Sequence, residues 1–162
     1  MRRTLLLGVI GISLWSSVVC GSQSTEALPA VLRPLLQNAR FGVVTSVRGL
    51  PLTVREELQT MWKSSSLDIA EPGAEFRKAG AAANSQLPLR RMIAAGCTND
   101  NYCLIYYERG GSAVTWQVAL FRWTPDATRF EWGGSAPSGL KTIEDVRKAM
   151  LSGVIKSHSG PW

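Results

Sequence analysis

The stretch that decides the fold is AAGCTNDNYCLIYYERGG, residues 94–111, which holds two of the three cysteines of the chain, Cys97 and Cys103. The residues before Cys97 are apolar and compatible with a strand, and those after Cys103 are rich in β-branched and aromatic side chains. Between them lie Asn99, Asp100 and Asn101, whose side chains favour turns. The pattern predicts a β-hairpin in which the two cysteines face each other across the tip.

Three kinds of chemistry are open to this pair of thiols: a metal site, a redox pair and a structural disulfide. A structural zinc site needs four ligands, and the only histidine is His158, near the end of the chain. A redox pair favours the C-x-x-C spacing at a helix N-terminus, whereas five residues separate these cysteines in a strand-like context. We therefore expect a Cys97–Cys103 disulfide, no bound metal and no cofactor.

The N-terminal segment predicts export. The chain begins MRRTLLLGVIGISLWSSVVCG, with Arg2 and Arg3 before an apolar run over 5–15. This run has the length of a signal-peptide core and is shorter than the ~20 residues that a membrane-spanning helix needs. We expect a signal peptide over residues 1–21 and a location in a bacterial periplasm or outside the cell. A disulfide persists in such an oxidising compartment.

Cys20 leaves two routes of processing open. A cysteine directly after an apolar signal core is where a bacterial lipoprotein carries its lipid, so Cys20 is a candidate lipidation site. Lipoprotein signals place a small residue before that cysteine, whereas Val19 stands here. The alternative is ordinary cleavage after Cys20 or Gly21. A lipid would attach the protein to a membrane by acyl chains, without a spanning helix.

Residues 22–162 have the length of a single domain with a hydrophobic core. The formal net charge is +6, and without Arg2 and Arg3 it is +4. The basic residues are scattered along the chain, which favours a solvated surface over a basic stripe for nucleic acid. We therefore expect no nucleic-acid partner.

The remaining pattern predicts an α+β fold. Strands are expected at about 90–97, 102–109, 113–123 and 128–133, forming a four-stranded antiparallel meander that ends at Gly133 and Gly134. Two helices are expected after capping boxes, one opened by Thr53 with Glu56 and the other by Thr142 with Asp145. A weaker helix is expected over 30–38, a strand over 40–47 and a short edge strand over 67–70. The segment 72–87 carries no clear pattern.

Catalytic groups are scarce. Without a histidine before position 158, the core cannot hold a Ser–His or Cys–His nucleophile pair. The remaining candidates are Glu108 and Glu131, because paired carboxylates can hydrolyse glycosides. The competing interpretation is two surface glutamates whose charges are balanced by Arg109 and Arg129.

The predicted meander is rich in aromatic side chains. Alternation places large apolar groups on both faces of its strands. This pattern fits either a sheet covered on both faces or an exposed aromatic patch that binds a protein or a glycan. The aromatic residues are Tyr106, Tyr107, Trp116, Phe121, Trp123, Phe130 and Trp132.

We expect a non-catalytic cell-envelope protein that binds a partner protein, in the manner of an inhibitor or an immunity protein. The alternative is a small exported hydrolase that uses Glu108 and Glu131. The residues expected to bind the partner lie at the hairpin tip and near it: Asn99, Asp100, Asn101, Tyr102 and Trp123.

Overall fold

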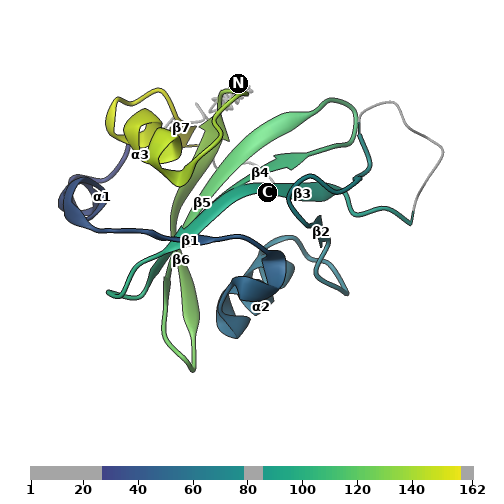
Figure 1. The fold of residues 1–162 in the computed structure, drawn as a ribbon, viewed down its shortest axis with the longest axis horizontal. Coiled ribbons are helices and arrows are strands. Elements are labelled where there is room, and N and C mark those ends of the chain that lie inside the picture. The colour runs from purple at the N-terminus through teal and green to yellow at the C-terminus, as the bar shows by residue number, and fades with distance from the viewer. Residues whose placement is uncertain (1–26, 79–85, 158–162) are drawn as a thin grey trace, which may run out of the picture.

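A seven-stranded sheet forms the centre of the protein (Figure 1). The computed structural model describes residues 27–78 and 86–157. Six strands follow the order β1-β3-β4-β5-β6-β7 through antiparallel pairs, and β2 lies parallel to β3. The strands are β1 (Gly42–Val44), β2 (Ile69–Ala70), β3 (Arg90–Cys97), β4 (Tyr102–Arg109), β5 (Thr115–Trp123), β6 (Thr128–Ala136) and β7 (Lys156–Ser157).

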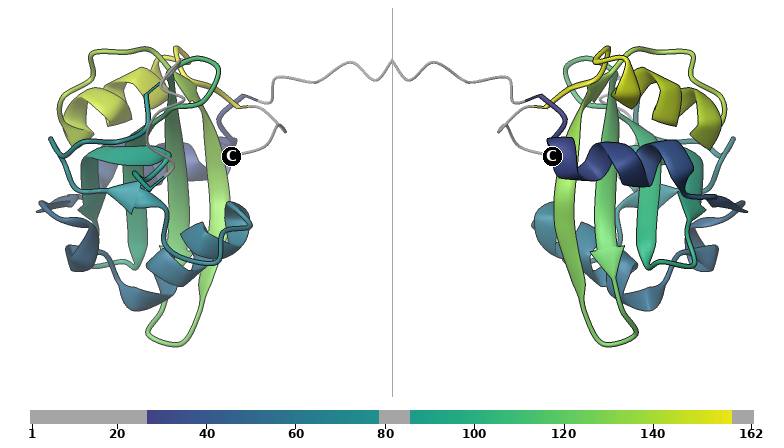
Figure 2. Two further views of the ribbon diagram at one scale, coloured as in Figure 1. Left: turned by 90° about the vertical axis from the view of Figure 1, so that its right-hand side faces the viewer. Right: turned by 90° about the vertical axis from the view of Figure 1, so that its left-hand side faces the viewer.

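Helices cover both faces of the sheet (Figure 2). On one face, α1 (Arg33–Asn38) and α3 (Ile143–Leu151) pack on a core that includes Leu104, Tyr106 and Leu120. On the other face, α2 (Leu52–Met61) packs on a second core. Two short 3₁₀ helices, η1 (Ala30–Leu32) and η2 (Val47–Gly49), precede α1 and α2. The sheet thus separates two hydrophobic cores.

The double cover decides between the two interpretations of the aromatic residues. Tyr106, Tyr107 and Phe121 are fully buried, and Trp132 is nearly so. The large apolar side chains exposed among the described residues are all aliphatic: Val31, Val43, Leu52 and Val154. The aromatic residues therefore build the two cores, and the described surface carries no exposed aromatic patch.

The α+β class and the antiparallel meander are confirmed, but the predicted count of four strands is wrong. The first two strands of the meander have the predicted bounds, and the third begins at Thr115. Two of the three additional strands, β1 and β2, lie within the short strands predicted over 40–47 and 67–70, and they join the same sheet as the meander. The third, β7, was not predicted, because a segment of two residues has no alternation that a sequence pattern can reveal.

Gly133 and Gly134 do not end the fourth strand, contrary to the prediction, because β6 continues to Ala136. The reason lies in β7, which pairs with β6 at Gly134 and Ser135. A Cβ atom at Gly134 would stand 2.3 Å from the carbonyl oxygen of Lys156. Glycine here allows the close approach of another backbone, which is a recognised use of glycine within strands.

The two predicted capping boxes have different outcomes. At α3, the Thr142 hydroxyl accepts from the Asp145 backbone N–H at 3.1 Å and the Asp145 carboxylate accepts from the Thr142 N–H at 3.0 Å, so this box is confirmed. At α2 the prediction is wrong, because Pro51 is the N-cap residue and Thr53 lies inside the first turn. The Thr53 hydroxyl instead donates to the carbonyl of Thr124, 3.0 Å away.

The segment before α2 is less regular than expected. The helix predicted over 30–38 consists of η1 and α1, with Pro34 in the first turn of α1. The strand predicted over 40–47 shrinks to β1, and Val47 begins η2. The Val47 N–H donates to the Glu71 carboxylate at 2.7 Å, which draws this residue out of the strand.

Several sequence predictions fall on residues outside the described part of the chain. These are the signal peptide over 1–21, the candidate lipidation site Cys20, and His158. Between residues 27 and 157, apart from 79–85, no helix combines the length and apolar character needed to cross a membrane.

Candidate functional site

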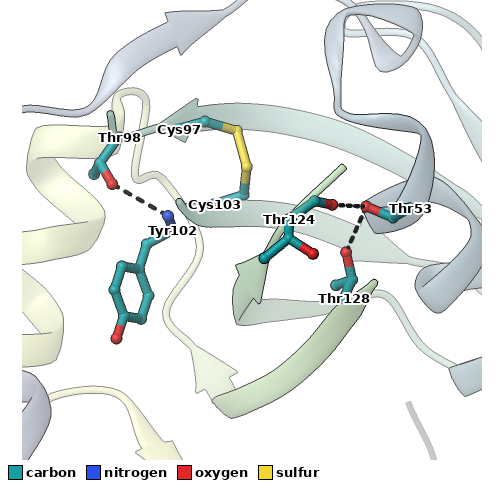
Figure 3. Close-up of a disulfide and its surroundings, with 7 residues drawn as sticks. All are labelled: Thr53, Cys97, Thr98, Tyr102, Cys103, Thr124 and Thr128. Atoms are coloured by element: carbon teal, nitrogen blue, oxygen red, sulfur yellow. Dashed lines mark hydrogen bonds between the residues drawn. A yellow bond between two sulfur atoms is a disulfide. The ribbon is translucent and has the colours of Figure 1, made fainter. Parts of the chain in front are cut away.

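The predicted disulfide is present at the β3–β4 hairpin tip (Figure 3). Cys97 and Cys103 stand directly opposite each other in the strand register, with Cα atoms 4.1 Å apart. Cys103 is fully buried in the core under α2, whereas Cys97 is partly exposed. The bridge therefore ties the hairpin tip to one of the two cores.

Hydrogen bonds within the tip hold its turn. The Thr98 N–H donates to the Tyr102 carbonyl at 2.7 Å, and the Tyr102 N–H donates to the Thr98 hydroxyl at 3.2 Å. Asn101 has φ +64°, a left-handed conformation that asparagine adopts more readily than most residues. The side chains of Asn99, Asp100 and Asn101 are exposed. The tip thus presents polar groups on a constrained backbone.

A second hairpin tip lies beside the first. The Trp123 N–H, at the end of β5, donates to the Asn101 carbonyl at 2.8 Å. The turn that follows closes through the Thr124 N–H and the Ala127 carbonyl, 2.7 Å apart. We call residues 99–102 and 123–127 together the tip surface.

The start of α2 supports the tip surface from one side. The Thr128 hydroxyl donates to the Thr53 hydroxyl at 2.8 Å, and Thr53 donates in turn to the Thr124 carbonyl (Figure 3). The predicted antiparallel meander already places the turn between 123 and 128 at the same end of the sheet as the turn between 97 and 102. The support from Thr53 depends on residues far apart in the chain, for which the sequence carries no local signal.

The two aromatic residues of the tip surface are only partly exposed. Tyr102 packs at the margin of the α1–α3 core, with the Arg122 guanidinium 5.8 Å from its ring centroid. Trp123 packs at the margin of the opposite core, where its buried indole N–H has no hydrogen-bond partner among the described residues. The exposed chemistry of the tip surface is therefore mainly polar, with aromatic edges at its border.

Reducing the Cys97–Cys103 disulfide is expected to lower the free energy of unfolding by about 2–2.5 kcal/mol, the chain-entropy value for so short a loop. Urea unfolding of the oxidised protein and of a Cys97→Ala, Cys103→Ala variant measures the difference. Equal midpoints would show that the bridge adds no stability. The matched control is Ser112→Ala, an exposed change in the β4–β5 turn.

Glu108 is committed to an ion pair inside the protein. It is 8% exposed, and its carboxylate accepts from Arg91 Nε at 2.6 Å. Arg91 also donates to the Ala74 carbonyl at 3.0 Å, and its guanidinium lies 4.7 Å from the Phe76 ring centroid. These contacts anchor the segment before β3 to the sheet. Glu108 is therefore a buried residue paired with Arg91, and not the surface charge balanced by Arg109 that the competing interpretation expected.

Glu131 is the extra residue of a β-bulge in β6, opposite Leu120 and Phe121 of β5. Its carboxylate accepts from Arg129 Nη2 at 2.6 Å, the neighbour expected to balance it. Glu108 pairs with Trp116, four residues before Leu120 on β5. Along the strands alone, the backbones of Glu108 and Glu131 are thus roughly 13 Å or more apart, and β5 lies between their two strands. In glycosidase pairs the two carboxyl groups lie only roughly 5–9.5 Å apart. The structure does not bring them together.

Two buried tyrosines near Glu108 lack the properties of a general base. Burial, followed by the negative charge of Glu108, raises the pKa of Tyr106 to about 12. Its hydroxyl donates to the Pro137 carbonyl at 2.8 Å. Burial also raises the pKa of Tyr107. Both phenols therefore remain protonated near neutral pH.

In the part of the chain that the structure describes, no three Asp, Glu, His or Cys side chains gather as a metal site would require.

Two open cavities lie beside β3, and each is lined in part by residues of that strand. One, of about 300 Å³, is lined in part by Phe76, Lys78 and Arg91. The other, of about 290 Å³, is mainly apolar and lies between β1 and the start of α3, with Lys141 as its only charged lining residue. Neither is lined by Glu108 or Glu131. Neither of these two cavities is therefore a cleft shared by the candidate carboxylate pair.

Comparisons with protein-family models, with curated proteins and with solved structures found no match to this chain.

Proposed function

We propose that this is an exported, non-catalytic protein that binds a partner protein through the tip surface. The observation that supports it most is the joining of two hairpin tips by the Trp123–Asn101 backbone hydrogen bond, next to the Cys97–Cys103 disulfide. A binding surface gains affinity when its backbone is held in place before the partner arrives, because less conformational entropy is lost on binding.

The chemistry of the tip surface suits a polar protein epitope. Asn99, Asp100 and Asn101 offer exposed hydrogen-bond donors and acceptors, and Asp100 adds a negative charge. Tyr102 and Trp123 border this polar group, and both residue types are enriched among the anchors of protein interfaces. A small inhibitor or immunity protein acts through such a surface without catalytic groups of its own. The burial of Glu108 and its distance from Glu131 remove the main support for the hydrolase alternative.

The test is affinity capture from a cell-envelope extract with three immobilised proteins. These are the chain from Gly21 onward, a tip variant (Asn99→Ala with Asp100→Ala) and a control variant (Gln37→Ala with Glu75→Ala). All four replaced side chains are exposed, and both variants lose one amide and one carboxylate. We expect the wild-type chain and the control variant to capture the same protein from the extract, and the tip variant to fail to capture it. A partner held equally by all three proteins would contradict the proposal.

A further inference from the structure

The two ends of the described chain meet beside α3. Arg33 at the start of α1 donates to the Leu151 carbonyl at the end of α3, 3.2 Å away. Arg147, earlier in α3, donates to the Leu36 carbonyl near the end of α1 at 2.9 Å. The two helices are thus antiparallel and adjacent (Figure 2). Leu28, shortly before η1, and Ile155, directly before β7, are buried in the same core.

The segments that meet here are basic throughout. Residues 27–41 and 146–157 contain five arginines and lysines and no aspartate or glutamate. Arg147 is turned inward toward α1 and also pairs with Glu144. Arg33, Lys148 and Lys156 are exposed. The acidic residues of α3, Glu144 and Asp145, lie in its first turn. Asp145 is one turn before Lys148 and feels its charge, whereas Arg33 and Lys156 lie outside this helix.

Exposed apolar side chains accompany these cations. Val31 in η1 is 80% exposed, and Val154, which follows α3, is 56% exposed. The Val154 N–H donates to the Ala149 carbonyl at 3.1 Å, which holds this residue against the last turn of α3. Val31 precedes Arg33 by two residues, and Val154 precedes Lys156 by two. We call this group of five exposed residues the basic–apolar patch: Val31, Arg33, Lys148, Val154 and Lys156.

We propose that the basic–apolar patch docks the protein on the surface of an anionic lipid bilayer. Arginine and lysine are attracted to anionic headgroups, while apolar side chains beside them enter the boundary between headgroups and acyl chains. Neither feature needs a deep pocket, and all five residues of the patch are exposed. Charge complementarity selects an anionic bilayer over a neutral one.

The position of Cys20 agrees with this docking. Cys20 precedes Ala27, the first described residue, by seven positions, and seven extended residues span at most about 25 Å. A lipid on Cys20 would therefore keep the patch close to the bilayer that holds the lipid. Acyl chains and basic patches commonly act together as two membrane signals. Docking by the patch itself does not require the lipid.

Docking in this way leaves the tip surface free. Lys156 pairs with Ser135 near the end of β6, whereas the tip surface adjoins Thr128 at its beginning. Seven residues of β-strand separate these positions, which corresponds to roughly 23 Å. The tip surface would therefore face away from the bilayer, toward a partner in solution.

Vesicle co-sedimentation of the chain from Gly21 onward, which lacks Cys20, tests the patch alone. The wild-type chain is expected to sediment with vesicles of equal parts phosphatidylcholine and phosphatidylglycerol, and not with pure phosphatidylcholine. Raising the salt from about 0.1 M to about 0.5 M should release it, because screening shortens the reach of the charges. The variant Arg33→Gln, Lys148→Gln, Lys156→Gln should bind at least about tenfold more weakly. Val31→Ser with Val154→Ser should also weaken binding.

The matched control neutralises Arg48, Lys63 and Lys78, three exposed cations outside the patch. It should retain binding, and an equal loss would show that only net charge matters, which would overturn the proposal. Equal binding of the wild-type chain to neutral vesicles, or no binding to anionic ones, would also overturn it. The proposal would also be overturned if the patch proved necessary for binding an acidic protein while the chain failed to bind anionic vesicles. If the triple variant does not fold, Lys148→Gln with Lys156→Gln leaves the Arg33 contact intact and serves instead.

Discussion

Replacing Phe121 by alanine is expected to lower the free energy of unfolding by about 3–5 kcal/mol, a large part of the about 5–15 kcal/mol that stabilises a typical domain. Phe121 is fully buried in the core between the sheet and α2. Its ring makes an edge contact with Phe130, with centroids 5.8 Å apart. The substitution would leave a cavity that the surrounding strands, held by hydrogen bonds on both sides, can fill only in part.

Urea unfolding, followed by tryptophan fluorescence and by circular dichroism, measures this loss. The control is Leu52→Ala on the α2 side, because Leu52 is 60% exposed. Exposed substitutions usually change stability by no more than about 0.5 kcal/mol. If Phe121→Ala cost as little as Leu52→Ala, α2 would not close this face of the sheet, and the second core would be wrong.

Met150→Ala is expected to cost about 2–5 kcal/mol from the opposite core. Met150 lies in α3 and is fully buried against the α1–α3 face of the sheet. The same unfolding measurement applies, with Lys148→Ala as the control because this residue is exposed on the same helix. If Phe121→Ala lowered the free energy of unfolding but Met150→Ala unfolded with nearly the same free energy as Lys148→Ala, α3 would not pack on the sheet as described.

The central hairpin was predictable because several local signals agree there. Strand-forming residues flank Asn99, Asp100 and Asn101, and the spacing of Cys97 and Cys103 suits a cross-strand disulfide. The second capping box was also predictable, since Thr142 and Asp145 act within one helical turn. Each of these features depends on residues close together in the chain, where sequence patterns carry most information.

Features that depend on distant residues were not predictable. Thr53 matches a capping residue by sequence, but the N-cap is Pro51, two residues earlier. The Thr53 hydroxyl instead donates to the β5–β6 turn. By sequence, Gly134 predicts the end of a strand, but in the fold it lies within β6 and allows the backbone of Lys156 to approach closely. Glu108 resembles a surface charge, and only the folded chain brings Arg91 to its carboxylate.

Titration of the captured partner protein tests most directly the central claim that the tip surface binds it. The purified partner is titrated with the wild-type chain, the Asn99→Ala, Asp100→Ala variant, the Gln37→Ala, Glu75→Ala control, and Glu131→Gln. We predict that the tip variant raises Kd by at least about tenfold, because it leaves polar groups of the partner buried without their hydrogen-bond partners, while the control and Glu131→Gln leave Kd unchanged. A folded tip variant that binds as tightly as the wild-type chain would contradict the claim.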